Sequence, residues 1–302
     1  EADMQGGGGP GTATAQHTSR LAWALALTST YMIAEVAGGL ITGSLALLAD
    51  AAHMLTDVAG LALALLAIRF AAREATPQRT YGYLRMEVLA ALTNAVVLLL
   101  LTVYILYEAY QRFVSPPEVM SGPMLVVAVI GLAVNLVSMR LLAGGSSESL
   151  NVKGAYFEVL SDMLGSIGVI VAALLMMWKG WRLADPLIGA GIGLFIVPRT
   201  FGLLKQVVHI LMEGTPPTVD LAVLERKLTE IAGVKSVHDL HVWTVTSGFD
   251  AMSCHLVVTD FSAARTVLAQ ARRAMSDDFG IDHVTIQVDD DALSRAEKTL
   301  HV

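Results

Sequence analysis

The chain has 302 residues, of which 54% are hydrophobic and 16% are charged, and its formal net charge is −7. Soluble domains average about 45–50% apolar and about 25% charged residues, so this composition argues for a membrane protein and against an ordinary soluble one. The acidic balance argues against nucleic acid as a partner, and the single cysteine, Cys254, excludes an intrachain disulfide.

Six apolar segments follow a stretch rich in glycine, alanine and threonine, residues 1–20, which is predicted to be a disordered N-terminal tail. Each segment has the roughly 20 residues that a membrane-spanning helix needs. Because five more follow the first, it is interpreted as a spanning helix and not as a cleaved signal peptide. Residues 21–212 are thus predicted to form an all-α, six-helix transmembrane bundle. The segments are residues 21–43, 45–71, 86–113, 124–143, 152–178 and 185–211.

The positive charges near the ends of these segments predict the orientation of the chain. Lys and Arg are more frequent around the gaps after the second and fourth segments than on the opposite side. This excess predicts that both termini, and with them the C-terminal domain, lie in the cytoplasm. The two sets are Arg69, Arg73, Arg79, Arg85, Arg140 and Lys153 against Arg112, Lys179 and Arg182.

From Glu213 onward the chain reads as an acidic soluble domain, with 8 Lys and Arg residues against 14 Asp and Glu. Hydrophobic periodicity predicts the order αββαβ, with the helices packed on one face of a small three-stranded sheet. This domain is assigned to residues 213–290, and residues 291–302 to a C-terminal tail. The predicted elements are a helix at 220–232, strands at 234–246 and 250–259, a helix at 263–275 and a strand at 283–288.

Two apolar segments carry ionisable side chains, which cost about 2.5–3.5 kcal/mol each in a bilayer on insertion scales. His53 and Asp57 are four residues apart in the second segment, and Glu158 and Asp162 repeat this spacing in the fifth, so each pair shares one helical face. Four N and O donors from two facing helices match the tetrahedral coordination of a zinc-type ion; the alternative is a set of structural polar contacts. Asp50, one turn before His53, is interpreted as a residue that orients His53 or as part of a proton path.

Other polar residues of the apolar segments are interpreted as structural. We expect Glu35 to be a protonated or hydrogen-bonded carboxyl that faces the bundle, in preference to a metal ligand. Asn94 and Asn135 are predicted to form hydrogen bonds between helices. Asp185, which precedes a proline near a helix start, is predicted to cap a helix.

Three stretches resemble signatures of the cation diffusion facilitator family, and they are closest to its bacterial cobalt–zinc–cadmium resistance branch. They are residues 44–57 (SLALLADAAHMLTD), 151–166 (NVKGAYFEVLSDMLGS) and 238–243 (HDLHVW). The resemblance implies a proton-coupled antiporter, and not an enzyme, that exports Zn²⁺, and also Cd²⁺ and Co²⁺, from the cytoplasm across a bacterial inner membrane. It implies a homodimer with a ferredoxin-like cytoplasmic domain and no cofactor apart from the bound, transported ions. It assigns the transport site to His53, Asp57, Glu158 and Asp162.

Two departures from that family's pattern concern the choice of metal. Many zinc-selective relatives have histidine where Glu158 stands, and glutamate is a harder ligand with a negative charge, which argues against strict zinc selectivity. The loop of residues 72–85 contains no histidine, so a second site that some relatives carry there is expected to be absent.

The resemblance also assigns a second metal site in the C-terminal domain to His238, His255 and Asp289. The alternative is that these are ordinary strand or surface residues. Cys254 neighbours His255 in a predicted strand and therefore points to the opposite face, into the core. Metal bound at this second site would neutralise part of the acidic charge and draw two subunits together. The weaker candidates for the site are His241 and His283.

Three carboxylates and one imidazole around an ion suggest how export is coupled to protons. An empty carboxylate cluster in low-dielectric surroundings favours proton uptake, and loading with metal expels those protons. Three other functions are alternatives to this interpretation. They are an intramembrane metalloenzyme, which needs a motif such as HExxH that the sequence lacks, a metal receptor that signals through its C-terminal domain, and a passive channel whose flux ignores the pH gradient.

Overall fold

A computed structural model describes the backbone of residues 13–71, 73, 75–143 and 150–297. Side chains are described in the same ranges apart from residues 13–22, 57, 60–69, 71, 150–155, 296 and 297. The chain divides into two compact units, residues 1–62 with 93–202 and residues 63–92 with 203–302.

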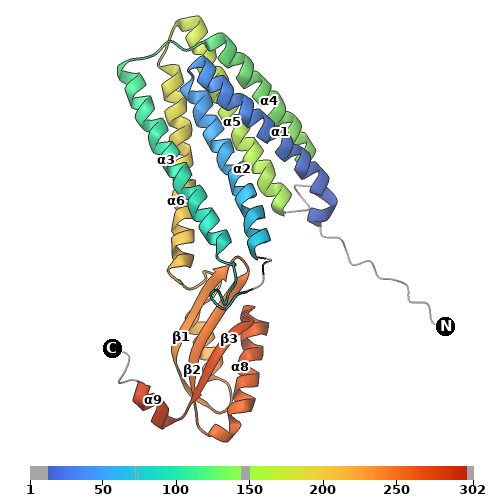
Figure 1. Cartoon of the computed structure of the whole chain (residues 1–302), viewed down its shortest axis with the longest axis vertical. Helices are drawn as coiled ribbons and strands as arrows, with labels where there is room; N and C mark the ends of the chain where they lie inside the picture. Colours follow the sequence, from blue (N-terminus) through green and yellow to red (C-terminus); the bar gives the residue numbers. More distant parts are fainter. Residues whose placement is uncertain (1–12, 72, 74, 144–149, 298–302) are drawn as a thin grey trace, which may run out of the picture. The chain divides into compact units, whose positions relative to one another are not determined.

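Long helices make up the N-terminal part of the chain (Figure 1). Among the described residues, five of them are long and apolar enough to cross a membrane, and the described apolar stretch of α2 is Leu45–Thr56. The chain is therefore a multi-pass membrane protein with a helical transmembrane region. The helices are α1 (Ala13–Thr42), α2 (Leu45–Ala71), α3 (Met86–Val114), α4 (Ser121–Ala143), α5 (Leu150–Lys179) and α6 (Ala184–Leu211).

The start of α1 differs most from the predicted segments. The helix begins at Ala13 and not at residue 21, so the prediction of a disordered tail is wrong for residues 13–20, whereas residues 1–12 lie outside the described residues. The physical reason is local: the glycine-rich run ends at Gly11, and the alanines and glutamine that follow are good helix formers.

Small residues allow the helices of the first unit to approach closely. Helices α1, α4 and α5 pack against one another, and an alanine-rich buried cluster joins residues of α2, α4, α5 and α6. A Cβ atom at Gly131 of α4 would lie 2.0 Å from the Tyr31 hydroxyl of α1, so this contact requires glycine. Large apolar side chains such as Leu40, Leu100 and Phe195 are 64–69% exposed, as expected for helix surfaces that face lipid.

Two side chains cap the start of α2. The Ser44 hydroxyl accepts a hydrogen bond from the Leu47 N–H (3.1 Å) and donates one to Asp185 Oδ1 (2.6 Å). Asp185, in the first turn of α6, also accepts hydrogen bonds from the N–H groups of Leu45 (2.8 Å) and Ala46 (3.2 Å). These bonds satisfy N–H groups that have no partner within their own helix. Asp185 therefore caps a helix, as predicted, but the helix is α2 and not α6, in whose first turn Asp185 lies.

The buried charge of Asp185 is compensated by Arg112 of α3. Asp185 is 0% exposed, and its Oδ2 lies 3.4 Å from Arg112 Nη1. Arg112 also donates to Glu108 Oε1 (2.9 Å) and to the carbonyl of Gly43. Because buried ion pairs are stable only when both partners remain, this network ties α2, α3 and α6 together at one end.

The C-terminal part folds as a three-stranded sheet with helices in the predicted αββαβ order (Figure 1). β1 and β2 are antiparallel and β2 and β3 are parallel, so β2 is the central strand. Buried residues of α7 and α8 pack against alternate residues of β2, among them Met252, Cys254 and Leu256, which therefore face the helices. The elements are α7 (Leu221–Thr229), β1 (Val234–Thr246), β2 (Phe249–Val258), η1 (Phe261–Ala263), α8 (Ala264–Phe279), β3 (His283–Asp289) and α9 (Asp291–Glu297).

Two features of this domain bear on the predictions. Cys254 is 1% exposed, and burial raises the pKa of its thiol to about 12, so it is the protonated core residue that the strand pattern predicts. Helix α9 lies in the stretch assigned to a C-terminal tail, so residues 291–297 of that stretch are helical. The Asp290 carboxylate accepts hydrogen bonds from the N–H groups of Ala292 and Leu293 and so caps this helix.

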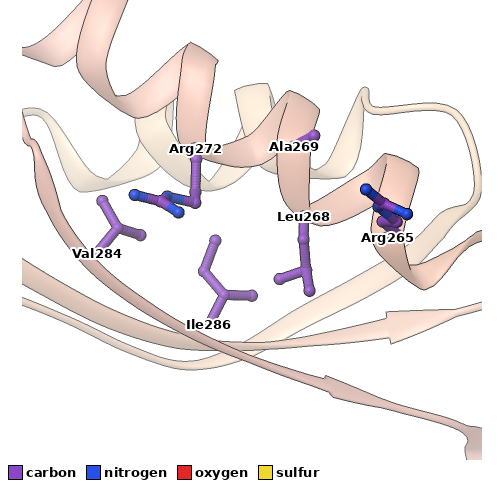
Figure 2. A pocket seen from close by; sticks show the side chains of 6 residues that line it. All are labelled: Arg265, Leu268, Ala269, Arg272, Val284 and Ile286. Carbon is purple, nitrogen blue, oxygen red and sulfur yellow. The ribbon is translucent and has the colours of Figure 1, made fainter.

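Strand β3 forms one edge of the sheet, and a surface groove lies between it and α8. Figure 2 shows Arg265 and Arg272 of α8 on either side of Leu268, above Val284 and Ile286 of β3. Positive charges beside an edge strand disfavour its pairing with the sheet of another molecule.

Asp185→Ala is expected to lower the free energy of unfolding by about 3–5 kcal/mol, because the buried end of Arg112 loses its carboxylate. Asp220→Ala is the comparison, since Asp220 is the exposed cap of α7 and accepts from the Ala222 and Val223 N–H groups; its loss should cost about 1 kcal/mol. Thermal unfolding of the purified variants in detergent measures both changes. Equal losses in the two variants would contradict a special role for Asp185.

Candidate metal sites

The apolar helices bring together two of the predicted ligands, His53 of α2 and Asp162 of α5. Both are buried, with 6% and 4% exposure, and His53 Nε2 lies 3.8 Å from Asp162 Oδ1. Within the described part of the chain, His53 Nε2 has no hydrogen-bond partner. Two ligand atoms of one tetrahedral zinc ion lie about 3.4 Å apart, so the spacing of the pair suits a shared ion better than a direct hydrogen bond.

The third predicted ligand, Glu158, forms an ion pair with Arg199 of α6. Glu158 Oε1 lies 2.9 Å from Arg199 Nη2, and both charges interact electrostatically with His53. Sequence reasoning missed Arg199, although the signal was available: it is an arginine inside an apolar segment, directly after Pro198. The structure therefore places a fixed positive charge beside the predicted carboxylate ligand.

The fourth predicted ligand, Asp57, lies one turn after His53 in α2. Its side chain is outside the described residues, so its role rests on the helical spacing, which puts it on the same face as His53. The assignment of all four residues to one ion stays a prediction.

Asp50 is buried between α2 and α5, one turn before His53. It is 1% exposed, and its two carboxylate oxygens have no hydrogen-bond partner among the described residues. The carboxylate packs on Gly165 of α5, where a Cβ atom would lie 2.1 Å from Asp50 Oδ1. A buried carboxyl group without hydrogen bonds is costly when ionised, which agrees with a group that holds a proton. Its predicted roles in orienting His53 or carrying protons stay predictions.

Three other polar residues of the bundle, Glu35, Asn135 and Asn94, form hydrogen bonds within the protein. The Tyr31 hydroxyl donates to Glu35 Oε1 (2.9 Å), so Glu35 is the hydrogen-bonded buried carboxyl that we expected. Asn135 Nδ2 donates to Ser166 Oγ (3.4 Å) between α4 and α5. Asn94 Nδ2 donates to the Thr56 carbonyl (3.3 Å) between α3 and α2, so the predicted interhelical hydrogen bonds are confirmed.

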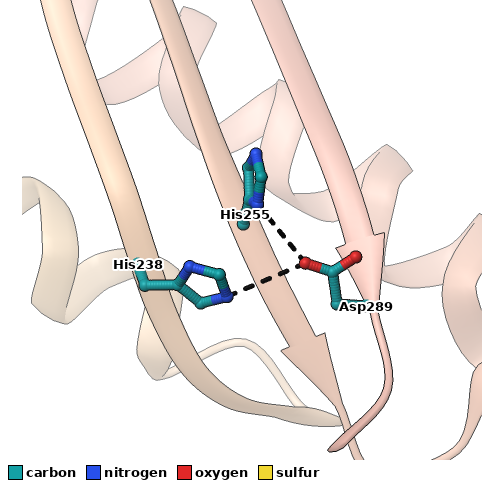
Figure 3. Close-up of side chains that lie close together, drawn as sticks. All are labelled: His238, His255 and Asp289. Atoms are coloured by element: carbon teal, nitrogen blue, oxygen red, sulfur yellow. Dashed lines mark ion pairs between the residues drawn. The ribbon is translucent and has the colours of Figure 1, made fainter. Parts of the chain in front are cut away.

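The C-terminal domain gathers His238, His255 and Asp289 on the face of the sheet opposite Cys254 (Figure 3). His238 of β1 pairs with His255 of β2, and Asp289 of β3 is in register with Val257, which shares a face with His255. Asp289 Oδ2 lies 3.7 Å from His238 Nε2 and 3.4 Å from His255 Nδ1. One ligand atom from each residue lies within 4.8 Å of the other two, a spacing compatible with two nitrogens and one oxygen around a divalent ion.

Neighbouring side chains orient this second cluster. Asp289 is 1% exposed, and the Gln287 amide donates to its Oδ1 (3.1 Å), which leaves Oδ2 directed at the histidines. Asp239 lies at a bulge of β1 with a positive φ of 50°, and its Oδ2 is 3.6 Å from His255 Nε2. A carboxylate beside the second imidazole nitrogen is a common way to orient a histidine ligand. Asp239 was not predicted, although it stands between the two histidines of HDLH.

The two weaker candidates make contacts elsewhere. His241 Nε2 lies 3.0 Å from Asp239 Oδ1, and its side chain is 63% exposed. His283 Nε2 lies 3.3 Å from the Tyr81 hydroxyl, at the opposite end of β3 from Asp289. Neither belongs to the group of His238, His255 and Asp289.

Apolar spanning helices with buried carboxylates and a histidine, joined to an acidic domain with a His/Asp cluster, define a membrane protein that handles divalent cations. The family comparison agrees. The model of the cation efflux transmembrane domain matches residues 21–212, and the model of the cation efflux protein cytoplasmic domain matches residues 216–291. The chain belongs to the cation efflux family, which confirms the resemblance to cation diffusion facilitators of the zinc, cadmium and cobalt branch.

Several curated relatives are similar over most of their length. The metal cation efflux system protein CzcD of Cupriavidus metallidurans is 50% identical over 279 residues, 92% of this chain and 88% of the relative. The cadmium, cobalt and zinc/H(+)-K(+) antiporter of Bacillus subtilis is 43% identical, over 87% of this chain and 86% of the relative. The zinc transporter ZitB of Escherichia coli is 43% identical, over 89% and 87%. A solved metal-bound C-terminal domain of a CzcD transporter is 41% identical with a TM-score of 0.22, and covers 24% of this chain and 99% of that structure.

Gly165→Ala is expected to reduce metal transport strongly, by about tenfold or more, because the added Cβ atom would collide with the Asp50 carboxylate and push α2 away from α5. Gly191→Ala is the matched control, since an added Cβ atom in that helix meets no atom of the described chain within 4 Å. Initial transport rates in proteoliposomes compare the two. A Gly165→Ala rate equal to that of Gly191→Ala would contradict the close contact.

Asp289→Asn is expected to remove one bound zinc ion per subunit, or to weaken its binding by about 100-fold, because a ligand is lost where even an orienting residue is worth about 10–100-fold. Asp278→Asn is the control, as Asp278 is a partly exposed aspartate of the same domain that pairs with Lys227. Zinc stoichiometry of the full-length protein after equilibrium dialysis measures the difference. The idea fails if both variants keep the wild-type stoichiometry.

Proposed function

We propose that the chain is a proton-coupled antiporter that exports Zn²⁺, and also Cd²⁺ and Co²⁺, from the cytoplasm. The observation that carries this proposal is the buried pair of His53 and Asp162, 3.8 Å apart between two apolar helices of a cation efflux protein. The names of relatives support it: the Bacillus subtilis protein is a cadmium, cobalt and zinc/H(+)-K(+) antiporter, and the Escherichia coli protein is a zinc transporter. The protein is a secondary transporter and not an enzyme.

The proposed transport site consists of His53, Asp57, Glu158 and Asp162. One imidazole and three carboxylates supply four donors, and the carboxylates together carry one charge more than a divalent ion neutralises. A mixed N and O site of this kind accepts Zn²⁺, Cd²⁺ and Co²⁺, and the hard oxygen of Glu158 makes it less selective for zinc than a site with a second histidine.

Competition between protons and metal at this one site provides the coupling. Without metal, carboxylates that lie close together in an apolar region favour proton uptake, because like charges in low-dielectric surroundings repel. Metal that enters from the cytoplasm displaces these protons, since the ligands must be deprotonated to bind. When the site opens to the other side, protons displace the metal and complete the exchange. Asp50, buried one turn from His53, is the proposed proton carrier or orienting residue beside the site.

The proposed architecture is a six-helix bundle over residues 21–212 and a ferredoxin-like cytoplasmic domain over residues 213–290. The proposed location is a bacterial inner membrane with both termini in the cytoplasm, as the distribution of Lys and Arg supports. The functional unit is a homodimer, which the match to the family's cytoplasmic domain supports.

The proposed role of His238, His255 and Asp289 is to bind the same metal in the cytoplasm. These ligands come from all three strands, so a bound ion would stabilise the sheet and reduce the acidic charge of the domain. Reduced repulsion would favour association of two such domains.

The decisive experiment measures metal efflux from proteoliposomes under an imposed pH gradient. Wild-type flux should follow the gradient, and Asp162→Asn should lower it by about 100-fold or more, because a ligand is removed from the site. Glu118→Gln is the control, since Glu118 is an 83% exposed carboxylate outside the apolar helices. A flux in Asp162→Asn equal to that of the wild type would contradict the assignment of Asp162 to the transport site. If the flux of the wild-type protein does not depend on the pH gradient, a passive channel is favoured.

A further inference from the structure

We propose that Arg199 is an internal cation that holds Glu158 in the metal-free protein and must release it before metal binds. Arg199 thereby sets the affinity of the transport site and helps to expel the ion. This inference rests on the proposed function, because it treats Glu158 as a ligand of the transported metal.

The geometry supplies the first step. Arg199 Nη2 and Glu158 Oε1 are 2.9 Å apart, the distance of a charge-assisted hydrogen bond. The two residues belong to α6 and α5, and both charges interact electrostatically with His53. Glu158 precedes Asp162 by one helical turn, so the ion pair adjoins the buried pair of His53 and Asp162.

The chemistry of arginine supplies the second step. A charge inside an apolar helix is costly, and a guanidinium group does not lose its proton in a protein. Arg199 therefore needs a carboxylate partner, and Glu158 supplies one. In the metal-free state one carboxylate of the site is paired with Arg199.

The third step is that the two cations exclude each other. A divalent ion that takes the Glu158 oxygen removes the acceptor of the Arg199 hydrogen bond and places like charges close together, which is unfavourable. Metal binding therefore weakens the ion pair, and this cost lowers the apparent affinity. In the reverse direction, the return of Arg199 to Glu158 favours release of the metal, because the carboxylate regains a partner as the ion leaves.

The test is equilibrium binding of Cd²⁺ and Zn²⁺ to the purified full-length protein. Every sample carries Asp289→Asn, which removes the second metal site in the C-terminal domain. Arg199→Gln removes the competing charge and should tighten binding by about fivefold, the upper value expected for an ion pair whose side chains are 58% and 42% exposed. In a Glu158→Gln background the same change should have much less effect, because the proposed competition acts through the Glu158 carboxylate. Arg182→Gln is the matched control, as Arg182 forms a 2.7 Å ion pair with Glu118 outside the apolar helices.

Unchanged or weaker binding in Arg199→Gln would overturn the proposal, as would an equal gain in affinity with and without Glu158. Arg199→Lys keeps the charge but loses the planar guanidinium, and should raise the affinity by about twofold or more. If Arg199→Gln does not yield folded protein, Arg199→Lys provides the test, and an affinity equal to that of the wild type counts against the proposal. Flux of the wild type under a pH gradient tests the proposed function separately, because binding can respond to Arg199 even in a protein that does not transport.

Discussion

The carboxylate of Asp185 is the point on which the geometry of α2 depends. It satisfies two N–H groups at the start of the helix, holds the Ser44 hydroxyl and neutralises the buried end of Arg112. A helix end inside an apolar bundle has no water to satisfy these groups, so the cap must come from the protein. His53 follows about two turns later, so the fixed start of α2 determines where His53 lies along the helix axis and which way its side chain points.

The rest of the bundle follows the same rule, that a polar group in an apolar region needs a partner. Tyr31 satisfies one oxygen of Glu35, and Arg199 satisfies Glu158. Asp50 and His53 Nε2 are buried without hydrogen bonds in the described part of the chain, as are Ser138 Oγ and the second oxygen of Glu35. Asp50 and His53 lie one helical turn apart beside Asp162, so the proposed mechanism assigns the chemistry of protons and metal to them.

Many features of the fold and of the candidate sites could be predicted from local sequence patterns. The four-residue spacing of Glu158 and Asp162 is a property of one helix, and the alternation around Cys254 is a property of one strand, so both were readable from neighbouring residues. Where a side chain pairs with a residue of another helix, the sequence does not show which residue is the partner. Asp185 was expected to cap, but its target lies about 140 residues earlier, and the partner of Glu158 lies 41 residues later. The bulge that turns Asp239 toward His255 depends on the register of β1 against β2, which has no local signal either.

The proline at position 198 has a mechanical consequence for the residue that follows it. Pro198 lies inside α6 and has no backbone N–H, so the turn of helix before Arg199 is held by one hydrogen bond fewer than the turns around it. A helix bends most easily where its ladder is interrupted. α6 therefore bends most easily directly before Arg199, and a bend there would change the position of the guanidinium relative to Glu158.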